Sequence, residues 1–153
     1  MQLVVLVGIP GAGKSTFYEK HLRTTHVHVS LDHWRGKKNR RRREEEAIRA
    51  GLQAGRDVAV DNTNPTVEDR ARYVALASEF GAELVAYYFP VDRDGCLTRN
   101  RRRTGKGAVP EAAIFTILGK LQPPRHTEGF HTIYYVRVVR DGGFSVEPAR
   151  EGG

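Results

Sequence analysis

The sequence has a single cysteine and no long apolar run, and each shortage excludes a class of protein. Cys96 alone cannot form an internal disulfide or a multi-cysteine metal site, and it indicates a reducing, cytoplasmic environment. A membrane-spanning helix needs roughly 20 apolar residues, which no run approaches, so we expect no membrane partner. The first residues, M-Q-L-V-V-L-V-G, lack the basic region and the cleavage site of a signal peptide, and we interpret them as a strand.

Acidic residues are fewer than basic ones. The chain holds 18 Asp and Glu against 25 Lys and Arg, with a formal net charge of +7 and a pI of about 9.9. This balance favours an acidic partner, either nucleic acid or a phosphorylated small molecule, although it can also serve solubility alone. At 153 residues the chain predicts one domain over 1–153, with an extension over 139–153 that is a small hairpin or is frayed.

Short apolar runs alternate with segments of helical character along the chain. Strands are expected at 2–7, 26–30, 57–61, 83–89 and 131–139, and helices at 15–24, 37–54, 66–80, 92–103 and from 110 onward. This order predicts an α/β fold with a mostly parallel sheet flanked by helices, whose ligands bind at the carboxyl ends of the strands. In the second helix, i,i+4 spacing predicts that Arg40, Arg41 and Arg42 pair with Glu44, Glu45 and Glu46.

The stretch G-I-P-G-A-G-K-S-T, residues 8–16, follows the first strand and opens the first helix. It fits the phosphate-binding pattern G-x-x-x-x-G-K-[ST], in which backbone N–H groups face an anion. Lys14 is then expected to reach the β- and γ-phosphates of a nucleoside triphosphate, and the Ser15 hydroxyl to bind Mg²⁺. The predicted nucleotide-binding residues here are Gly8, Pro10, Gly11, Ala12, Gly13, Lys14, Ser15 and Thr16.

The stretch V-S-L-D-H-W-R, residues 29–35, lies where the second strand should end. Sheet topology brings Asp32 near the phosphate loop, where a carboxylate can take a proton from an acceptor alcohol; the alternative is a helix N-cap. Arg35 suits a phosphate on the acceptor, or it belongs to a solvated face. Trp34 offers a stacking surface for a base, or it packs in the core.

The third strand ends in V-D-N-T-N-P. Asp61 is expected to hold a metal through water or to orient Ser15. Asn62 and Thr63 are candidates for substrate binding, although both are also ordinary turn formers.

A second basic cluster, R-N-R-R-R-T-G-K-G, covers residues 99–107. Arg99 and Arg103 are four residues apart, so one helix face can direct both toward the triphosphate as a basic lid segment. The alternative is a solvated basic end of a helix.

Together, G-I-P-G-A-G-K-S-T-F, V-H-V-S-L-D-H-W-R, V-A-V-D-N-T-N-P, R-A-R-Y-V, A-V-P and E-G-F resemble the motifs of 5′-hydroxyl polynucleotide kinases. This family includes the kinase module of polynucleotide kinase–phosphatase repair enzymes, and the resemblance spans residues 2 to about 138. It implies a P-loop kinase-like fold that transfers the γ-phosphate of ATP, with Mg²⁺, to the 5′-OH end of DNA or RNA.

The same resemblance assigns roles to individual residues. It implies that Lys14 contacts the triphosphate, that Asp32 is the general base, and that Arg35 grips the phosphate on the 3′ side of the acceptor nucleotide. Arg99 and Arg103 match the lid arginines, although the spacing between Arg103 and A-V-P is one residue longer than in the phage-type pattern of the family. The dense basic run over 37–43 matches no family motif.

Two other functions fit the same residues. A small-molecule kinase, acting on a sugar, a nucleoside or a nucleotide-sugar, would use Asp32 and the lid in the same way. A non-catalytic, ATP-gated nucleic-acid-binding module would use the basic runs, but it would not need the pair Asp32 and Arg35.

Overall fold

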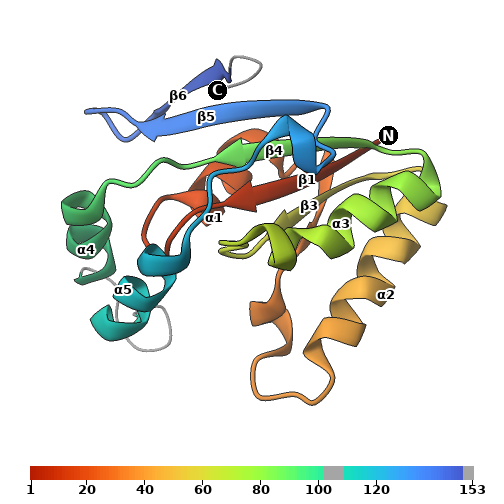
Figure 1. The fold of residues 1–153 in the computed structure, drawn as a ribbon, viewed down its shortest axis with the longest axis horizontal. Helices are drawn as coiled ribbons and strands as arrows, with labels where there is room; N and C mark the ends of the chain where they lie inside the picture. The colour runs from red at the N-terminus through yellow and green to blue at the C-terminus, as the bar shows by residue number, and fades with distance from the viewer. Residues whose placement is uncertain (102–108, 150–153) are drawn as a thin grey trace.

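A computed structural model describes residues 1–101 and 109–149, apart from the side chains of Arg93, Asp94, Cys96 and Arg99 in helix α4. Within these residues, six strands form one sheet in the order β2-β3-β1-β4-β5-β6 (Figure 1). The strands are β1 (Gln2–Val7), β2 (His26–Val29), β3 (Asp57–Asp61), β4 (Glu83–Tyr88), β5 (Thr132–Val138) and β6 (Phe144–Pro148). The first five are parallel and β6 is antiparallel to β5, so the predicted mostly parallel sheet is confirmed.

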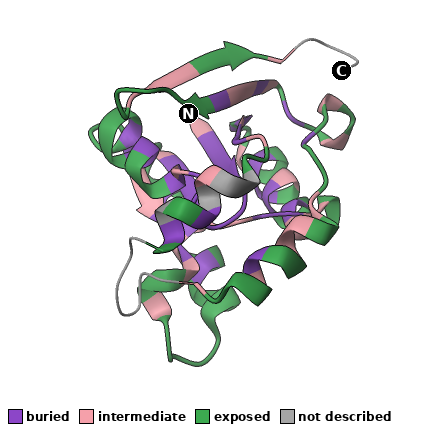
Figure 2. Ribbon diagram, turned by 90° about the vertical axis from the view of Figure 1, so that its left-hand side faces the viewer, coloured by how far each residue is buried: buried purple, intermediate pink, exposed green. Residues whose placement is uncertain are grey.

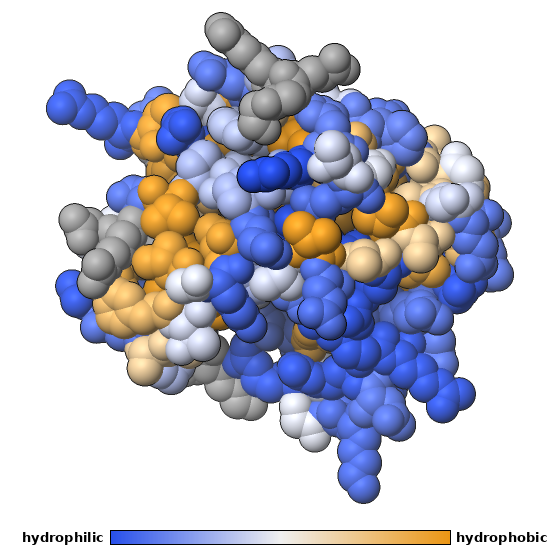
Figure 3. Space-filling model, viewed as in Figure 1, coloured by the Kyte–Doolittle hydropathy of each residue, from blue (hydrophilic) through white to orange (hydrophobic). Residues whose placement is uncertain are grey.

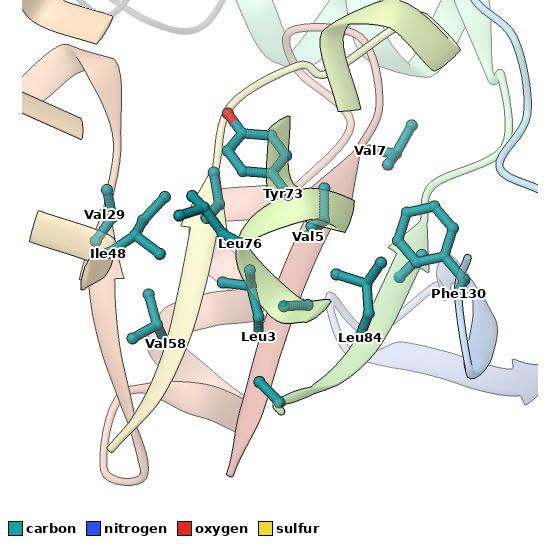
Figure 4. Packing of buried hydrophobic residues seen from close by; sticks show 14 of the residues in the cluster. Leu3, Val5, Val7, Val29, Ile48, Val58, Tyr73, Leu76, Leu84 and Phe130 are labelled. Carbon is teal, nitrogen blue, oxygen red and sulfur yellow. The ribbon is translucent and has the colours of Figure 1, made fainter. Parts of the chain in front are cut away.

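Helices cover both faces of the sheet. The apolar residues of β1 point alternately to opposite sides, so each face has apolar side chains to bury. Leu3, Val5 and Val7 pack with the cluster beneath α2 and α3 (Figure 4), whereas Val4 and Leu6 pack with the cluster beneath α1 and α5. Figure 2 shows the resulting band of buried residues through the middle of the molecule. The helices are α1 (Lys14–Phe17), which continues as a π turn over Tyr18–Leu22, α2 (Arg40–Gln53), α3 (Val67–Phe80), α4 (Arg93–Arg101) and α5 (Glu111–Lys120).

The second helix begins later than predicted. Leu31–Trp34 form a 3₁₀ turn, and α2 starts at Arg40 rather than at residue 37. Gly36 and Asn39 have φ angles of 78° and 58°, in the left-handed region that a continuing helix cannot include. The basic residues that precede α2 therefore lie on an exposed loop beside the carboxyl end of β2 (Figure 1).

Strands β5 and β6 form a hairpin, one of the two alternatives predicted for 139–153, of which the structure describes residues up to 149. Val136 pairs with Val146, and the hairpin packs against the phosphate loop. A Cβ atom on Gly13 would lie 3.2 Å from Phe144 and 3.4 Å from Val138, so the hairpin leaves no room for a larger residue there. The ring of Phe144 also meets that of Phe17 edge to face, with 5.3 Å between centroids.

None of the helices in the described part of the chain combines the length and the apolar character needed to cross a bilayer.

Candidate active site

The loop between β1 and α1 has the backbone geometry of an anion cradle. Gly11 and Gly13 adopt φ angles of 83° and 100°, which side chains with a Cβ atom rarely tolerate. The buried ammonium of Lys14 donates hydrogen bonds to the carbonyl oxygens of Gly8, at 2.8 Å, and Ile9, at 2.9 Å. These bonds hold the Lys14 side chain against the loop, where it lines the adjoining pocket.

One carboxylate links the phosphate loop to the neighbouring strands. Asp61, at the end of β3, accepts a hydrogen bond from Ser15 Oγ at 2.8 Å and another from His28 Nε2 at 2.8 Å. Burial alone would raise the pKa of Asp61, but these two hydrogen bonds and the charge of Lys14 outweigh it and lower the pKa below the usual 3.8. Asp61 therefore stays ionised and accepts the Ser15 hydroxyl, a contact that fits one of the two roles expected for it.

A pocket of about 640 Å³ lies at the carboxyl edge of the sheet, and most of the predicted residues meet in it. From the phosphate loop it is lined by Pro10, Gly11, Gly13, Lys14 and Ser15; from the neighbouring strands and turns by Leu31, Asp32, Arg35, Arg40, Asp61, Asn62, Thr63 and Val109. The structure thus brings the candidate base and the candidate acceptor arginine to the same cavity as the phosphate loop.

Asp32 presents its carboxylate to solvent at the rim of this pocket. Its side chain is 72% exposed, and it accepts a hydrogen bond from Arg35 Nη2 at 3.0 Å. The N-cap of the 3₁₀ turn is Ser30, whose hydroxyl accepts the backbone N–H of Asp32 at 3.2 Å. The helix-capping alternative for Asp32 is therefore wrong, and its carboxylate can meet a ligand.

Four predicted residues lie apart from this group. Trp34 is half-buried against the core cluster beneath α2, so the structure places it in its core alternative and does not bring it to the pocket. Ala12 faces a separate cavity of about 220 Å³, between the ends of β4 and β5. Gly8 is buried, where its N–H donates to the carbonyl oxygen of Thr63 at 3.0 Å. Thr16 is exposed and does not line the pocket.

The basic lid falls largely on residues that the structure does not describe. Arg103 lies outside the described residues, and so does the side chain of Arg99. On the far side of that gap, Val109 lines the pocket and exchanges backbone hydrogen bonds with the Asn100 side chain, at 2.6 and 2.8 Å. The end of helix α4 is thereby joined to a residue that lines the pocket.

The sequence analysis did not predict a buried polar group that contacts the turn carrying Asp32. Glu44 is almost fully buried and accepts hydrogen bonds from Tyr73 Oη, at 3.0 and 3.1 Å, and from Asn62 Nδ2, at 2.7 Å. Burial and the charge of Glu44 raise the pKa of the Tyr73 hydroxyl, which stays a donor. Asn62 Oδ1 accepts the N–H of Leu31 at 2.9 Å, so this group positions the turn that carries Asp32. In the sequence, the N-T-N turn was the only indication of this buried group, because Glu44 lies in an E-E-E run that is typical of a solvated face.

A glycine-rich loop after β1, closed by a buried lysine and joined to a serine–aspartate pair at β3, defines a P-loop nucleotide-binding protein. The family described as AAA domain matches residues 3–124, and the chain belongs to it.

Curated relatives confirm the resemblance to polynucleotide kinases. The bifunctional polynucleotide phosphatase/kinase of Schizosaccharomyces pombe is 28% identical over 138 residues, covering 86% of this chain. A protein of Acanthamoeba polyphaga mimivirus named for the same two activities is 37% identical over 154 residues, covering 96% of this chain. The chain spans about a third of the length of these relatives, 32% and 36% respectively.

Solved structures confirm the fold. A fungal RNA kinase superposes with a TM-score of 0.71 at 13% identity, over 91% of this chain and 39% of that one. A gluconokinase from Sinorhizobium meliloti 1021 superposes with a TM-score of 0.65 at 21% identity, over 91% of this chain and 83% of that one. The architecture is therefore that of P-loop kinases.

Proposed function

We propose that this chain is a single P-loop kinase domain that transfers the γ-phosphate of ATP to the 5′-OH end of DNA or RNA. The observation that carries the proposal is the shared pocket, in which Asp32 and Arg35 face the phosphate loop. A hydrolase has to orient water, whereas a kinase needs a base for an alcohol and a cation for the acceptor, and these two residues supply both.

In the reaction, the backbone N–H groups of the loop and the ammonium of Lys14 bind the donor phosphates. The oxygen of the 5′-OH attacks the γ-phosphorus while the Asp32 carboxylate accepts the hydroxyl proton, and ADP leaves. Arg35, which already meets Asp32, holds the phosphate on the 3′ side of the acceptor nucleotide.

The oxygen donors at the pocket suit Mg²⁺, which prefers carboxylates, hydroxyls and water. The Ser15 hydroxyl, and Asp61 through a water molecule, would hold it, and the ion would neutralise charge on the phosphates. Lid roles for Arg99 and Arg103 and base stacking on Trp34 stay predictions. For Trp34, ligand binding would have to move a side chain that packs against the core.

The names of the curated relatives support a polynucleotide acceptor. The gluconokinase fold favours a second candidate, a small-molecule kinase, because the same base and phosphate loop would serve a sugar hydroxyl. The two candidates differ in the acceptor alone, so the acceptor decides between them.

The test supplies ATP labelled at its γ-phosphate to matched DNA and RNA oligonucleotides that carry a 5′-OH, and to a panel of sugars and nucleosides. We expect label on the oligonucleotide 5′ ends and none on the same oligonucleotides already phosphorylated there. Transfer to a sugar or nucleoside, with none to either oligonucleotide, would establish the second candidate instead.

A further inference from the structure

Four cations follow Asp32 along the chain, and none of them meets an acidic partner among the residues that the structure describes. Lys37, Lys38, Arg40 and Arg43, which we name the basic rim, are all exposed and span the loop before α2 and its first turn. In Figure 1 this loop projects from the lower edge of the molecule, and Figure 3 shows a strongly hydrophilic surface there. Arg40 itself lines the pocket.

The rest of the basic run is paired. Arg41 meets Glu44 at 3.3 Å and Arg42 meets Glu46 at 3.2 Å. The remaining glutamate of the E-E-E run, Glu45, pairs with Arg49, one turn further along α2, at 3.2 Å. By contrast, no carboxylate in the described part of the chain pairs with a member of the basic rim, and Arg43 Nε donates only to the carbonyl oxygen of Lys38, at 3.2 Å.

The direction of the Glu44 side chain explains why Arg40 does not pair with it. The sequence predicted a pair between Arg40 and Glu44 and another between Arg41 and Glu45, and both predictions were wrong. Glu44 points inward, to Tyr73 and Asn62, and the arginine that it meets is Arg41 rather than Arg40. The fold thus directs Arg40 to the pocket and leaves a line of positive charge leading away from it.

We propose that the basic rim binds the phosphodiester backbone of a single-stranded nucleic acid beyond its terminal nucleotide. The inference rests on the proposed function and extends it, because it names the part of the acceptor that lies outside the pocket. A sugar or nucleoside would fit within the pocket and would not reach Lys37 or Lys38, whereas a polynucleotide carries a phosphate at every step.

The test compares a nucleoside 3′-monophosphate with short 5′-OH oligonucleotides, as DNA and as RNA. The variant is Lys37→Ala/Lys38→Ala/Arg40→Ala. The control, Arg23→Ala/Arg42→Ala/Arg72→Ala, removes the same charge from exposed residues that do not line the pocket. For the rim variant, we expect the KM for the oligonucleotide to rise about tenfold more than the KM for the monophosphate. The salt dependence of oligonucleotide binding should fall by about 2 in logarithmic slope, at about 0.7 per contact.

Equal rises in both KM values, or the same effect in the control, would overturn the proposal, and the DNA and RNA arms show which strand the rim prefers. Fluorescence anisotropy of the labelled oligonucleotide separates this proposal from the proposed function. If the native chain transfers no phosphate but the rim variant still loses binding, the rim stands and the kinase assignment fails. If the rim variant binds like the native chain, the rim is overturned whether or not phosphate is transferred.

Discussion

The pocket has a donor side, formed by the phosphate loop and Asp61, and an acceptor side, formed by the turn of Asp32 and the basic rim. On the donor side, the functional groups are bonded within the chain: Lys14 bonds two carbonyl oxygens, and Asp61 bonds Ser15 and His28. On the acceptor side, Asp32 is 72% exposed and the basic rim has no acidic partners among the described residues. Contacts within the chain therefore hold the donor side, whereas the exposed groups of the acceptor side can meet a ligand. Substitutions should cost stability on the first side and activity alone on the second.

The largest effect should come from Asp32→Asn on the acceptor side. Loss of a general base typically lowers a rate by about 10²–10⁴-fold, while an exposed side chain contributes little to folding. We expect phosphate transfer to fall by that factor, with the melting temperature shifted by less than about 2 °C. Glu19→Gln, another exposed carboxylate beside an arginine, is the matched control. A variant that keeps most of its transfer rate would remove Asp32 from the role of base.

A comparable loss, but of stability, is expected for Arg70→Met in α3, outside the pocket. Arg70 is fully buried, binds Glu128 through two hydrogen bonds of 2.9 Å and donates to the carbonyl oxygen of Asn64. Removing it leaves a buried carboxylate unpaired, which costs about 3–5 kcal/mol. Urea unfolding measures this, and Arg70→Met/Glu128→Gln should recover part of the loss. A similar loss for Arg42→Ala, at an exposed ion pair, would contradict the comparison.

An intermediate effect, dependent on pH, is expected for Asp61→Asn. The folded chain lowers the pKa of Asp61, so the ionised carboxylate stabilises the fold above its usual pKa of 3.8, and this stability is lost as the pH falls through the folded value. The variant should lose about 2 kcal/mol at neutral pH, where the native carboxylate accepts two hydrogen bonds. Urea unfolding across the acidic range should show the difference between the two proteins shrinking. A difference that stays constant with pH would mean that the ionised form is not what stabilises the fold.

The smallest effect is expected for Asn62→Ala, which joins the two sides. The substitution leaves the N–H of Leu31 and the carboxylate of Glu44 each one hydrogen bond short, at a cost of about 1 kcal/mol. Because this contact positions the turn of Asp32, kcat should fall while the KM for ATP stays near its native value. A rise in the KM for ATP alone would place Asn62 on the donor side instead.

The sequence was sufficient to predict the parts of the fold in which the residue types themselves restrict the backbone geometry. Glycines around Lys14 predicted the loop, and the apolar runs predicted the parallel strands that bring Asp32 and Asp61 to one edge. It was insufficient where the rotation of a helix decides. Nothing in R-R-R-R-E-E-E shows that Glu44 turns inward, where it meets Arg41 and not Arg40.

The hairpin over β5 and β6 has a consequence for shortened versions of the chain. Phe144 occupies the space next to Gly13, and Lys20, just after α1, donates a hydrogen bond at 3.1 Å to the carbonyl oxygen of Gly142 at the hairpin turn. Cutting the chain after Val138 would uncover the phosphate loop on that side and detach the residues that brace the first helix. Nucleotide affinity would then fall although every residue of the glycine-rich motif remained in place, so the functional boundary of this protein lies well beyond its last recognisable motif.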